Sequence, residues 1–180
     1  DYQRKRLYKL MLHMYGIFLE AVSEGSGVTA VGDSLKIKIT ALNRSNANIK
    51  LEGIGIFLNG AEIPNCNPGV YNEQFNQALA TQKAFNKTIG FISCPKAQTS
   101  KLYWLAQPIK DNKFVHTQNI EPWGLASNYL VLFDLNIDGE TFQFGEDLKY
   151  KWTDPDKGEN YRAHLLVPPV TVKLPYNFVL

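Results

Sequence analysis

The chain has 180 residues, 44% of them hydrophobic and 20% charged, and a formal net charge of +2 at pH 7. This length fits one domain, or one domain with an appendage, and the hydrophobic share supports a buried core and argues against disorder. The charge lacks the strong basic excess of nucleic-acid-binding proteins, and no apolar run approaches the roughly 20 residues of a membrane-spanning helix. We therefore expect no nucleic-acid partner and no membrane span.

Residues 1–15, DYQRKRLYKLMLHMY, predict an α-helix. Apolar residues at steps of three and four are expected to form one face: Leu7, Leu10, Met11, Met14 and Tyr15. Gly16 suits the end of the helix because glycine adopts positive φ without steric cost. An isolated helix of this length is marginal in water, so it must pack on the rest of the chain or on a neighbouring unit.

Residues 32–58 form the centre of the predicted fold. Leu35, Ile37 and Ile39 alternate with polar residues, which predicts a strand with one buried face in an antiparallel sheet. After the turn residues 43–46, a second strand is expected, whose phase changes at Gly53 and indicates a β-bulge there.

Further strand patterns follow at intervals typical of a sandwich. They cover 17–23, 28–31, 85–92, 129–137, 141–144, 148–152, 161–167 and 170–174, with hairpin turns at 59–60 and 138–139. Residues 64–84 and 106–128 are interpreted as long loops, with a helical turn as an option for 77–84. We expect an all-β, immunoglobulin-like antiparallel β-sandwich of about eight strands over 17–180, preceded by one α-helix over 1–16.

No catalytic pattern is visible. His13, His116 and His164 stand far apart without metal-ligating spacing, and there is no nucleophile elbow or phosphate-binding glycine loop. We expect this chain to contain no catalytic residue and to bind no cofactor.

The loop that contains Asp154, Asp156 and Glu159 is a weak candidate for a calcium site, because spaced carboxylates can hold that ion through oxygen ligands. The same residues are also good turn formers. The surrounding sequence predicts a structural cluster of Trp152, Asp154 and Arg162, with an Asp–Arg contact across the loop.

Aromatic residues offer a possible sugar platform at Tyr103, Trp104 and Trp123, with Tyr150 and Trp152 as further candidates. The alternative is that these rings pack in the core or at strand edges.

Two cysteines, Cys66 and Cys94, do not fit a metal motif. They form either one disulfide or two unrelated buried thiols.

A family resemblance is carried by YKWTDPDKGENYR at 150–162, followed by VPPV. Together with GIFLEA at 16–21, GDSLKIKITALNRS at 32–45 and SKLYWL at 100–105, this segment resembles the non-catalytic region of large bacterial deacetylases of the PIG-L, or LmbE-like, family, especially those of Bacteroidetes.

The resemblance implies a role beside an enzyme. In that family a preceding domain holds a divalent metal, usually zinc, through an HPDDE-type motif and a further histidine, and removes an N-acetyl group from a glucosamine-like sugar. Those motifs are not in this chain, so no catalytic residue is carried over. The resemblance also implies that residues 1–16 are the tail of a linking segment and that the parent protein is exported, a setting in which the cysteine pair favours a disulfide.

Two functions are then expected from different classes. The first is an accessory or interaction domain that packs on, or positions, the upstream catalytic domain. The alternative is a carbohydrate-binding module that presents a glycan to that enzyme.

Overall fold

The computed structural model describes residues 2–58, 69–101, 109–110, 112–113 and 127–170. Its elements are α1 (Tyr2–Met14), β1 (Ile17–Ser23), β2 (Val28–Ala30), β3 (Ser34–Asn43), β4 (Ile49–Leu58), β5 (Gly69–Ala78), β6 (Phe85–Ile92), β7 (Tyr129–Ile137), β8 (Glu140–Asp147), β9 (Lys149–Asp154), β10 (Gly158–Ala163) and β11 (Leu165–Val167).

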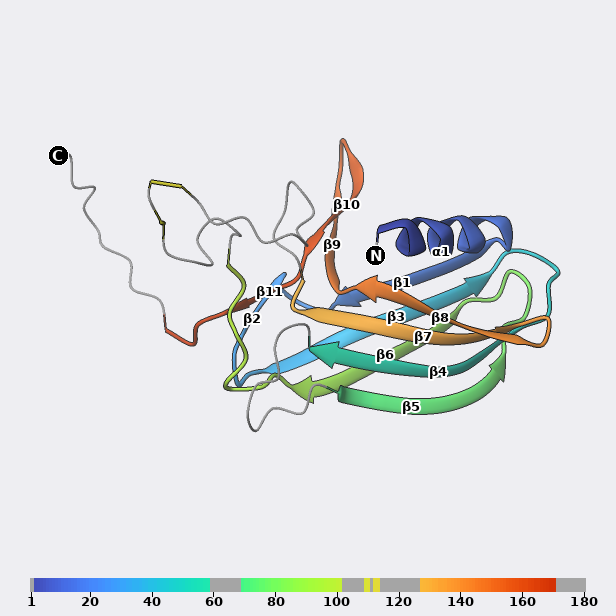
Figure 1. Cartoon of the computed structure of the whole chain (residues 1–180), viewed down its shortest axis with the longest axis horizontal. Helices are drawn as coiled ribbons and strands as arrows, with labels where there is room; N and C mark the ends of the chain where they lie inside the picture. Colours follow the sequence, from blue (N-terminus) through green and yellow to red (C-terminus); the bar gives the residue numbers. More distant parts are fainter. Residues whose placement is uncertain (1, 59–68, 102–108, 111, 114–126, 171–180) are drawn as a thin grey trace.

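The described strands form a β-sandwich, as the sequence predicts. One sheet has five strands in the order β10-β9-β1-β3-β6, and the facing sheet has four in the order β5-β4-β7-β8. Figure 1 shows the two layers with α1 lying along β1. On the opposite side the sheets meet through Phe75 and Phe85, whose ring centroids are 5.5 Å apart, and through a 2.6 Å ion pair between Lys87 and Glu73.

The predicted alternation of the central strand is confirmed. Leu35, Ile37 and Ile39 on β3 are at most 2% exposed, while the lysines between them face solvent. Across the sandwich, alternate residues of β7 such as Val131 and Phe133 are fully buried. The core therefore lies between these two strands and their neighbours, as period-two patterning requires.

The bulge predicted at Gly53 is also confirmed. The register of β4 shifts between Leu51 and Gly53 against both β5 and β7. A β-carbon at Gly53 would lie 2.8 Å from the side-chain amide of Gln74 on β5, so this amide rests in space that a larger residue would occupy.

The buried face of α1 differs from the predicted one. Leu7 and Leu10 are each 54% exposed and Met14 is 76% exposed. Met11 and Tyr15 pack on the core as predicted, but their partners there are Tyr8 and Leu12. The packed face is therefore turned toward Tyr8 and Leu12 and away from Leu7, Leu10 and Met14. Tyr8 fixes the rotation through an edge-to-face contact with Phe144, at 5.7 Å between centroids.

Strand β5 replaces part of the predicted loop 64–84, and the helical turn considered for 77–84 is not formed. Strand β5 lies at the edge of its sheet, and within residues 71–78 the half-buried positions are Tyr71, Glu73 and Phe75. An edge strand faces solvent on more sides, which makes its hydrophobic pattern weak.

Eleven strands occur in the described residues, more than the eight or so expected, and not all of them are antiparallel. Strand β1 meets β9 in a parallel bridge at Val22 and Lys149. Strand β2 pairs in parallel with β11 as a separate two-stranded sheet.

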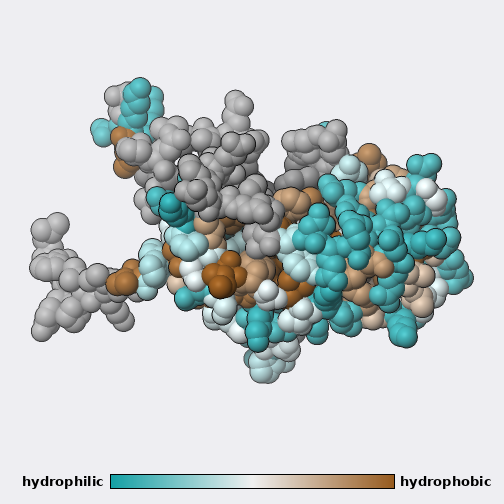
Figure 2. Space-filling view, turned by 90° about the horizontal axis from the view of Figure 1, so that it is seen from below, coloured by the Kyte–Doolittle hydropathy of each residue, from teal (hydrophilic) through white to brown (hydrophobic). Residues whose placement is uncertain are grey.

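The lower face of the molecule is shown in Figure 2. Hydrophilic side chains cover much of it, with hydrophobic areas between them. No helix in the described part of the chain is long and apolar enough to cross a membrane.

Candidate functional site

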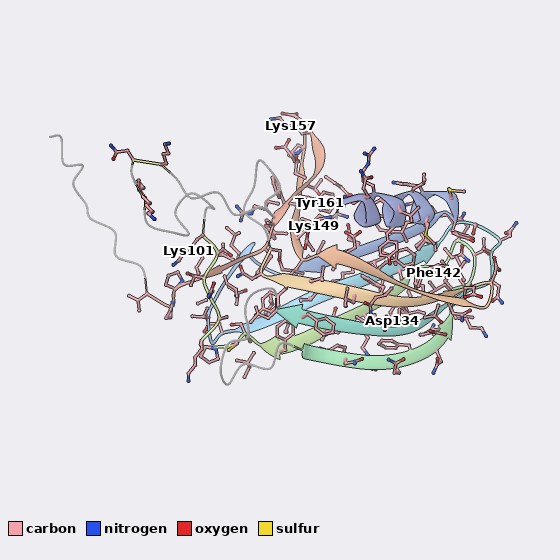
Figure 3. All side chains as sticks on the ribbon, in the orientation of Figure 1. Lys101, Asp134, Phe142, Lys149, Lys157 and Tyr161 are labelled. Atoms are coloured by element: carbon pink, nitrogen blue, oxygen red, sulfur yellow. The ribbon has the colours of Figure 1, made fainter. Side chains whose placement is uncertain are left out.

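Strands β9 and β10 form a hairpin that projects beyond the sandwich (Figure 1). Their antiparallel register pairs Arg162 with Tyr150, Asn160 with Trp152 and Gly158 with Asp154. In Figure 3, Lys157 lies at the tip of the hairpin and Lys149 at its base. Because side chains alternate along each strand, the hairpin presents two faces of different chemistry.

One face is held to β1 by a compact polar network. The Nζ atom of Lys151 lies 2.9 Å from a carboxylate oxygen of Glu159 and 3.3 Å from one of Glu20. The hydroxyl of Tyr161 donates to Glu20 at 2.7 Å. The charged side chains of this network are thus paired with one another, so we interpret this face as the one that anchors the hairpin to β1.

The network also shifts the proton affinities of its members. The hydrogen bond from Lys151 holds the pKa of Glu159 below its usual range, and the same contact raises the pKa of Lys151. Burial, followed by the bond to Glu20, raises the pKa of Tyr161. All three remain in their ordinary charge states at neutral pH, which keeps the anchor intact.

The opposite face carries Tyr150, Trp152 and Arg162, and we refer to it as the aromatic–arginine face. The two rings lie 5.9 Å apart at an interplanar angle of 16°. The Arg162 guanidinium carbon lies 5.0 Å from the Tyr150 ring centroid and 6.0 Å from that of Trp152. At these distances cation–π attraction orders the guanidinium.

Gly27 lies close to the Arg162 and Tyr150 side chains of the aromatic–arginine face. A β-carbon there would lie 2.7 Å from Nε and Nη2 of Arg162 and 2.9 Å from Cβ of Tyr150. The absence of a side chain at Gly27 thus lets the backbone lie against the guanidinium.

The predicted cluster of Trp152, Asp154 and Arg162 is only partly brought together. All three occupy the same face of the hairpin, and Trp152 contacts Arg162. The expected contact between Asp154 and Arg162 is not formed, because the register places them at opposite ends of the ladder. Asp154 instead accepts backbone hydrogen bonds from Asp156 at 2.9 Å and Lys157 at 3.0 Å, which stabilise the turn.

The weak calcium site is not assembled. Asp154 uses Oδ1 on the turn backbone, while Glu159 turns toward Lys151. Across the described residues, no three His, Cys, Asp or Glu side chains converge as metal ligands. The alternative interpretation, that these acids form a turn, fits the geometry.

Several other candidates lie outside the described residues. The sugar platform predicted at Tyr103, Trp104 and Trp123 is among them, as is Cys66. Cys94 is disulfide-bonded. Its pairing with Cys66 stays a prediction.

Helix α1 presents a second surface, which we name the α1 stripe: Leu7, Leu10 and Met14. These side chains share one line along the helix and are all more than half exposed. Arg6, Lys9 and His13 are also exposed and follow a parallel line beside them. An apolar line with a basic border is thus left open on a helix whose other face is packed.

His164 is a buried residue whose environment the sequence did not reveal. It is 0% exposed, and neither ring nitrogen has a hydrogen-bond partner in the described part of the chain. Burial, with a smaller contribution from the charge of Arg162, lowers the pKa of His164 to about 4. The imidazole is therefore neutral at physiological pH.

Comparisons with known proteins identify no family. No protein-family model matches the chain, and no curated protein matches it. Among solved structures, the chain resembles the beta-glucosidase from Listeria innocua in complex with glucose, at 17% identity and a TM-score of 0.29, over 73% of this chain and 16% of that one. A mutant of the same enzyme in complex with laminaribiose gives the same identity and coverage and a TM-score of 0.30. Likenesses this low carry no functional argument.

Proposed function

We propose that this chain is a non-catalytic accessory domain of an exported PIG-L/LmbE-like deacetylase, and that it docks on the upstream catalytic domain. The α1 stripe is the observation that carries this proposal. Three large apolar side chains on one line of a helix, each more than half exposed, favour contact with another protein surface. The sequence segments at 150–162 and 32–45 resemble the family in which such a domain is expected.

The rest of the chain is consistent with a supporting role. The sandwich gives α1 a rigid base, since Tyr8, Met11, Leu12 and Tyr15 fix one side of the helix. The α1 stripe is thereby held in a fixed orientation, which reduces the conformational entropy lost on binding. Within one chain, docking also gains from high effective concentration.

Substitutions on the α1 stripe test this proposal in the longer protein. Leu10→Glu and Met14→Glu together should loosen the domains, because two charges would be placed in an apolar contact. Limited proteolysis near Gly16 should then become faster than in the unsubstituted protein. Lys9→Glu is the matched control on the same helix and should change the cleavage rate much less. Equal cleavage rates for the double variant and the unsubstituted protein would reject docking through this stripe.

A second experiment tests the non-catalytic part. The isolated chain should release no acetate from N-acetylglucosamine oligomers when zinc is supplied, because hydrolysis needs a metal-bound water and a base in one cleft. Zinc-dependent acetate release would overturn the proposal.

A further inference from the structure

The Arg162 guanidinium has no ion-pair partner among the described residues. Lys151, on the other face of the hairpin, pairs with two carboxylates. The Arg162 guanidinium lies over the Tyr150 and Trp152 rings and close to Gly27, and no carboxylate in the described ranges forms an ion pair with it. Its side chain is exposed and lies beside Trp152, which is 38% exposed. A fixed, solvent-accessible guanidinium next to an open indole ring is suited to a ligand with both an anionic group and an apolar face.

We propose that the aromatic–arginine face binds a glycan that contains uronic acids. The site extends beyond the docking function of helix α1, because it shares no residue with the α1 stripe and does not require an upstream domain. It also differs from the sugar platform predicted at Tyr103, Trp104 and Trp123, both in its residues and in the charge of its ligand.

Each part of a uronic acid finds a partner on this face. The C–H face of a pyranose ring stacks on the exposed indole of Trp152. The sugar carboxylate accepts two parallel hydrogen bonds from the planar guanidinium of Arg162, whose geometry matches that of a carboxylate. Asn160 lies opposite Trp152 in the ladder, and its amide nitrogen donates to the Gly158 carbonyl at 3.0 Å. The Asn160 Oδ1 atom is then free to accept from a sugar hydroxyl.

The site is largely organised before a ligand arrives. The guanidinium lies over the Tyr150 ring and close to Gly27, and these neighbours restrict its rotamers. On the reverse face, the bonds of Lys151 and Tyr161 to Glu20 hold the hairpin to β1. Pre-ordered groups lose less entropy on binding, so a small surface can still be selective.

An acidic peptide is the competing ligand, and the geometry favours it less. A peptide carboxylate would use Arg162 but would leave the ring of Trp152 without a matching surface. The indole stacks on the phenol at 5.9 Å and 16°, so one of its faces is covered, and the exposed remainder of the ring offers a flat surface to a single sugar.

Calorimetric titration of the chain with four probes tests the proposal: tetragalacturonate, tetramannuronate, the methyl ester of tetragalacturonate, and tetraglutamate. At least one uronate should bind, and the ester and the peptide should bind at least tenfold more weakly. The ester keeps the ring faces but lacks the charge, whereas the peptide keeps the charge but lacks the rings. Absence of binding by both uronates, or equal binding of tetraglutamate, overturns the proposal.

Variants assign the binding to this face. Arg162→Gln should weaken uronate binding roughly tenfold or more, which corresponds to about 1.4 kcal/mol. Lys157→Gln removes the same charge from the tip of the same hairpin and should leave the affinity within about twofold. Trp152→Ala should abolish stacking, while Trp152→Phe retains a ring and should preserve most of the affinity. Thermal melts identify any variant that fails to fold, and unchanged uronate affinity in a folded Arg162→Gln protein rejects the site.

Discussion

Residue His164 shows how burial fixes a charge state. The His164 residue is fully buried, and its backbone N–H donates to the Leu148 carbonyl at 3.1 Å, but the imidazole ring has no hydrogen bond in the described structure. A buried polar group without a partner costs free energy, and the cost is higher for the charged form.

Stability should therefore fall on acidification in a way that depends on His164. Its folded-state pKa of about 4 lies below the ordinary 6.5, so the unfolded chain takes up the proton first. The contribution is fully present above pH 6.5 and is lost as the pH falls toward 4, by about 1–3 kcal/mol. Denaturant titrations of His164→Leu should show a smaller drop over this window than the unsubstituted chain, with stability at pH 7 equal or higher. Identical pH profiles would contradict this assignment.

A second residue-level prediction concerns Cys66 and Cys94. If they form one disulfide, the denatured, unreduced protein should contain no reactive thiol, and reduction should expose two. Thiol titration measures this directly. Two reactive thiols before reduction would show that the cysteines are unpaired.

At the scale of elements, the predictability of each strand follows its burial. In β3 and β6 exposed residues alternate with more buried ones, so period-two alternation locates them, whereas β7 is marked by its apolar run because its second face is half-buried. Strand β5 was missed because its residues at the sheet edge are mostly polar. The rotation of α1 was missed because Leu7 and Tyr8 are both acceptable in a packed face, and only the shape of the partner surface around Phe144 decides between them.

The packed face of α1 can be tested by truncation. Tyr8→Ala should reduce the unfolding free energy by about 1–3 kcal/mol, because it removes the ring that contacts Phe144. Leu7→Ala should change it by less than about 0.5 kcal/mol, since Leu7 is 54% exposed. Chemical denaturation measures both. A larger loss at Leu7 than at Tyr8 would restore the face expected from the sequence.

The hairpin between β7 and β8 depends on its two turn residues. Asp138 and Gly139 have φ of 51° and 99°, the positive pair that suits a tight antiparallel turn. A β-carbon at Gly139 would meet nothing within 4 Å, so the cost of Gly139→Ala comes from the backbone conformation alone.

Gly139→Ala should therefore lower the unfolding free energy by about 1 kcal/mol or more. Gly90→Ala is the matched control, since Gly90 lies in β6 without positive φ and its added β-carbon would meet Lys36 Cγ at an ordinary 3.8 Å. This control should be neutral or stabilising by up to about 1 kcal/mol. Thermal melts of the two variants compare them, and equal losses would argue against a backbone origin.

The candidate surfaces were predictable only in part from the sequence. The 150–162 segment predicts that Trp152 and Arg162 lie together, but residue types do not reveal the pairing register that separates Asp154 from Arg162. The contribution of Gly27 arises from a chain segment more than a hundred positions away. Such contacts depend on how the sheets are connected, which alternation patterns do not encode.

At the scale of the whole molecule, the sandwich holds two exposed surfaces on separate elements. The α1 stripe is apolar with a basic border, and the aromatic–arginine face combines rings with a guanidinium that has no ion-pair partner among the described residues. In the proposed function the first contacts the catalytic domain, and in the separate glycan proposal the second binds uronic acids. Neither surface needs catalytic groups in this chain.

Hydrogen exchange of the α1 amides tests the docking proposal most directly. The rates are compared between the isolated chain and the longer protein in which the upstream domain is present. If the α1 stripe is the docking surface, amides of residues 7–14 should exchange more slowly in the longer protein, and Leu10→Glu with Met14→Glu should restore the faster rates. Equal exchange rates in the isolated chain and the longer protein would contradict docking through α1.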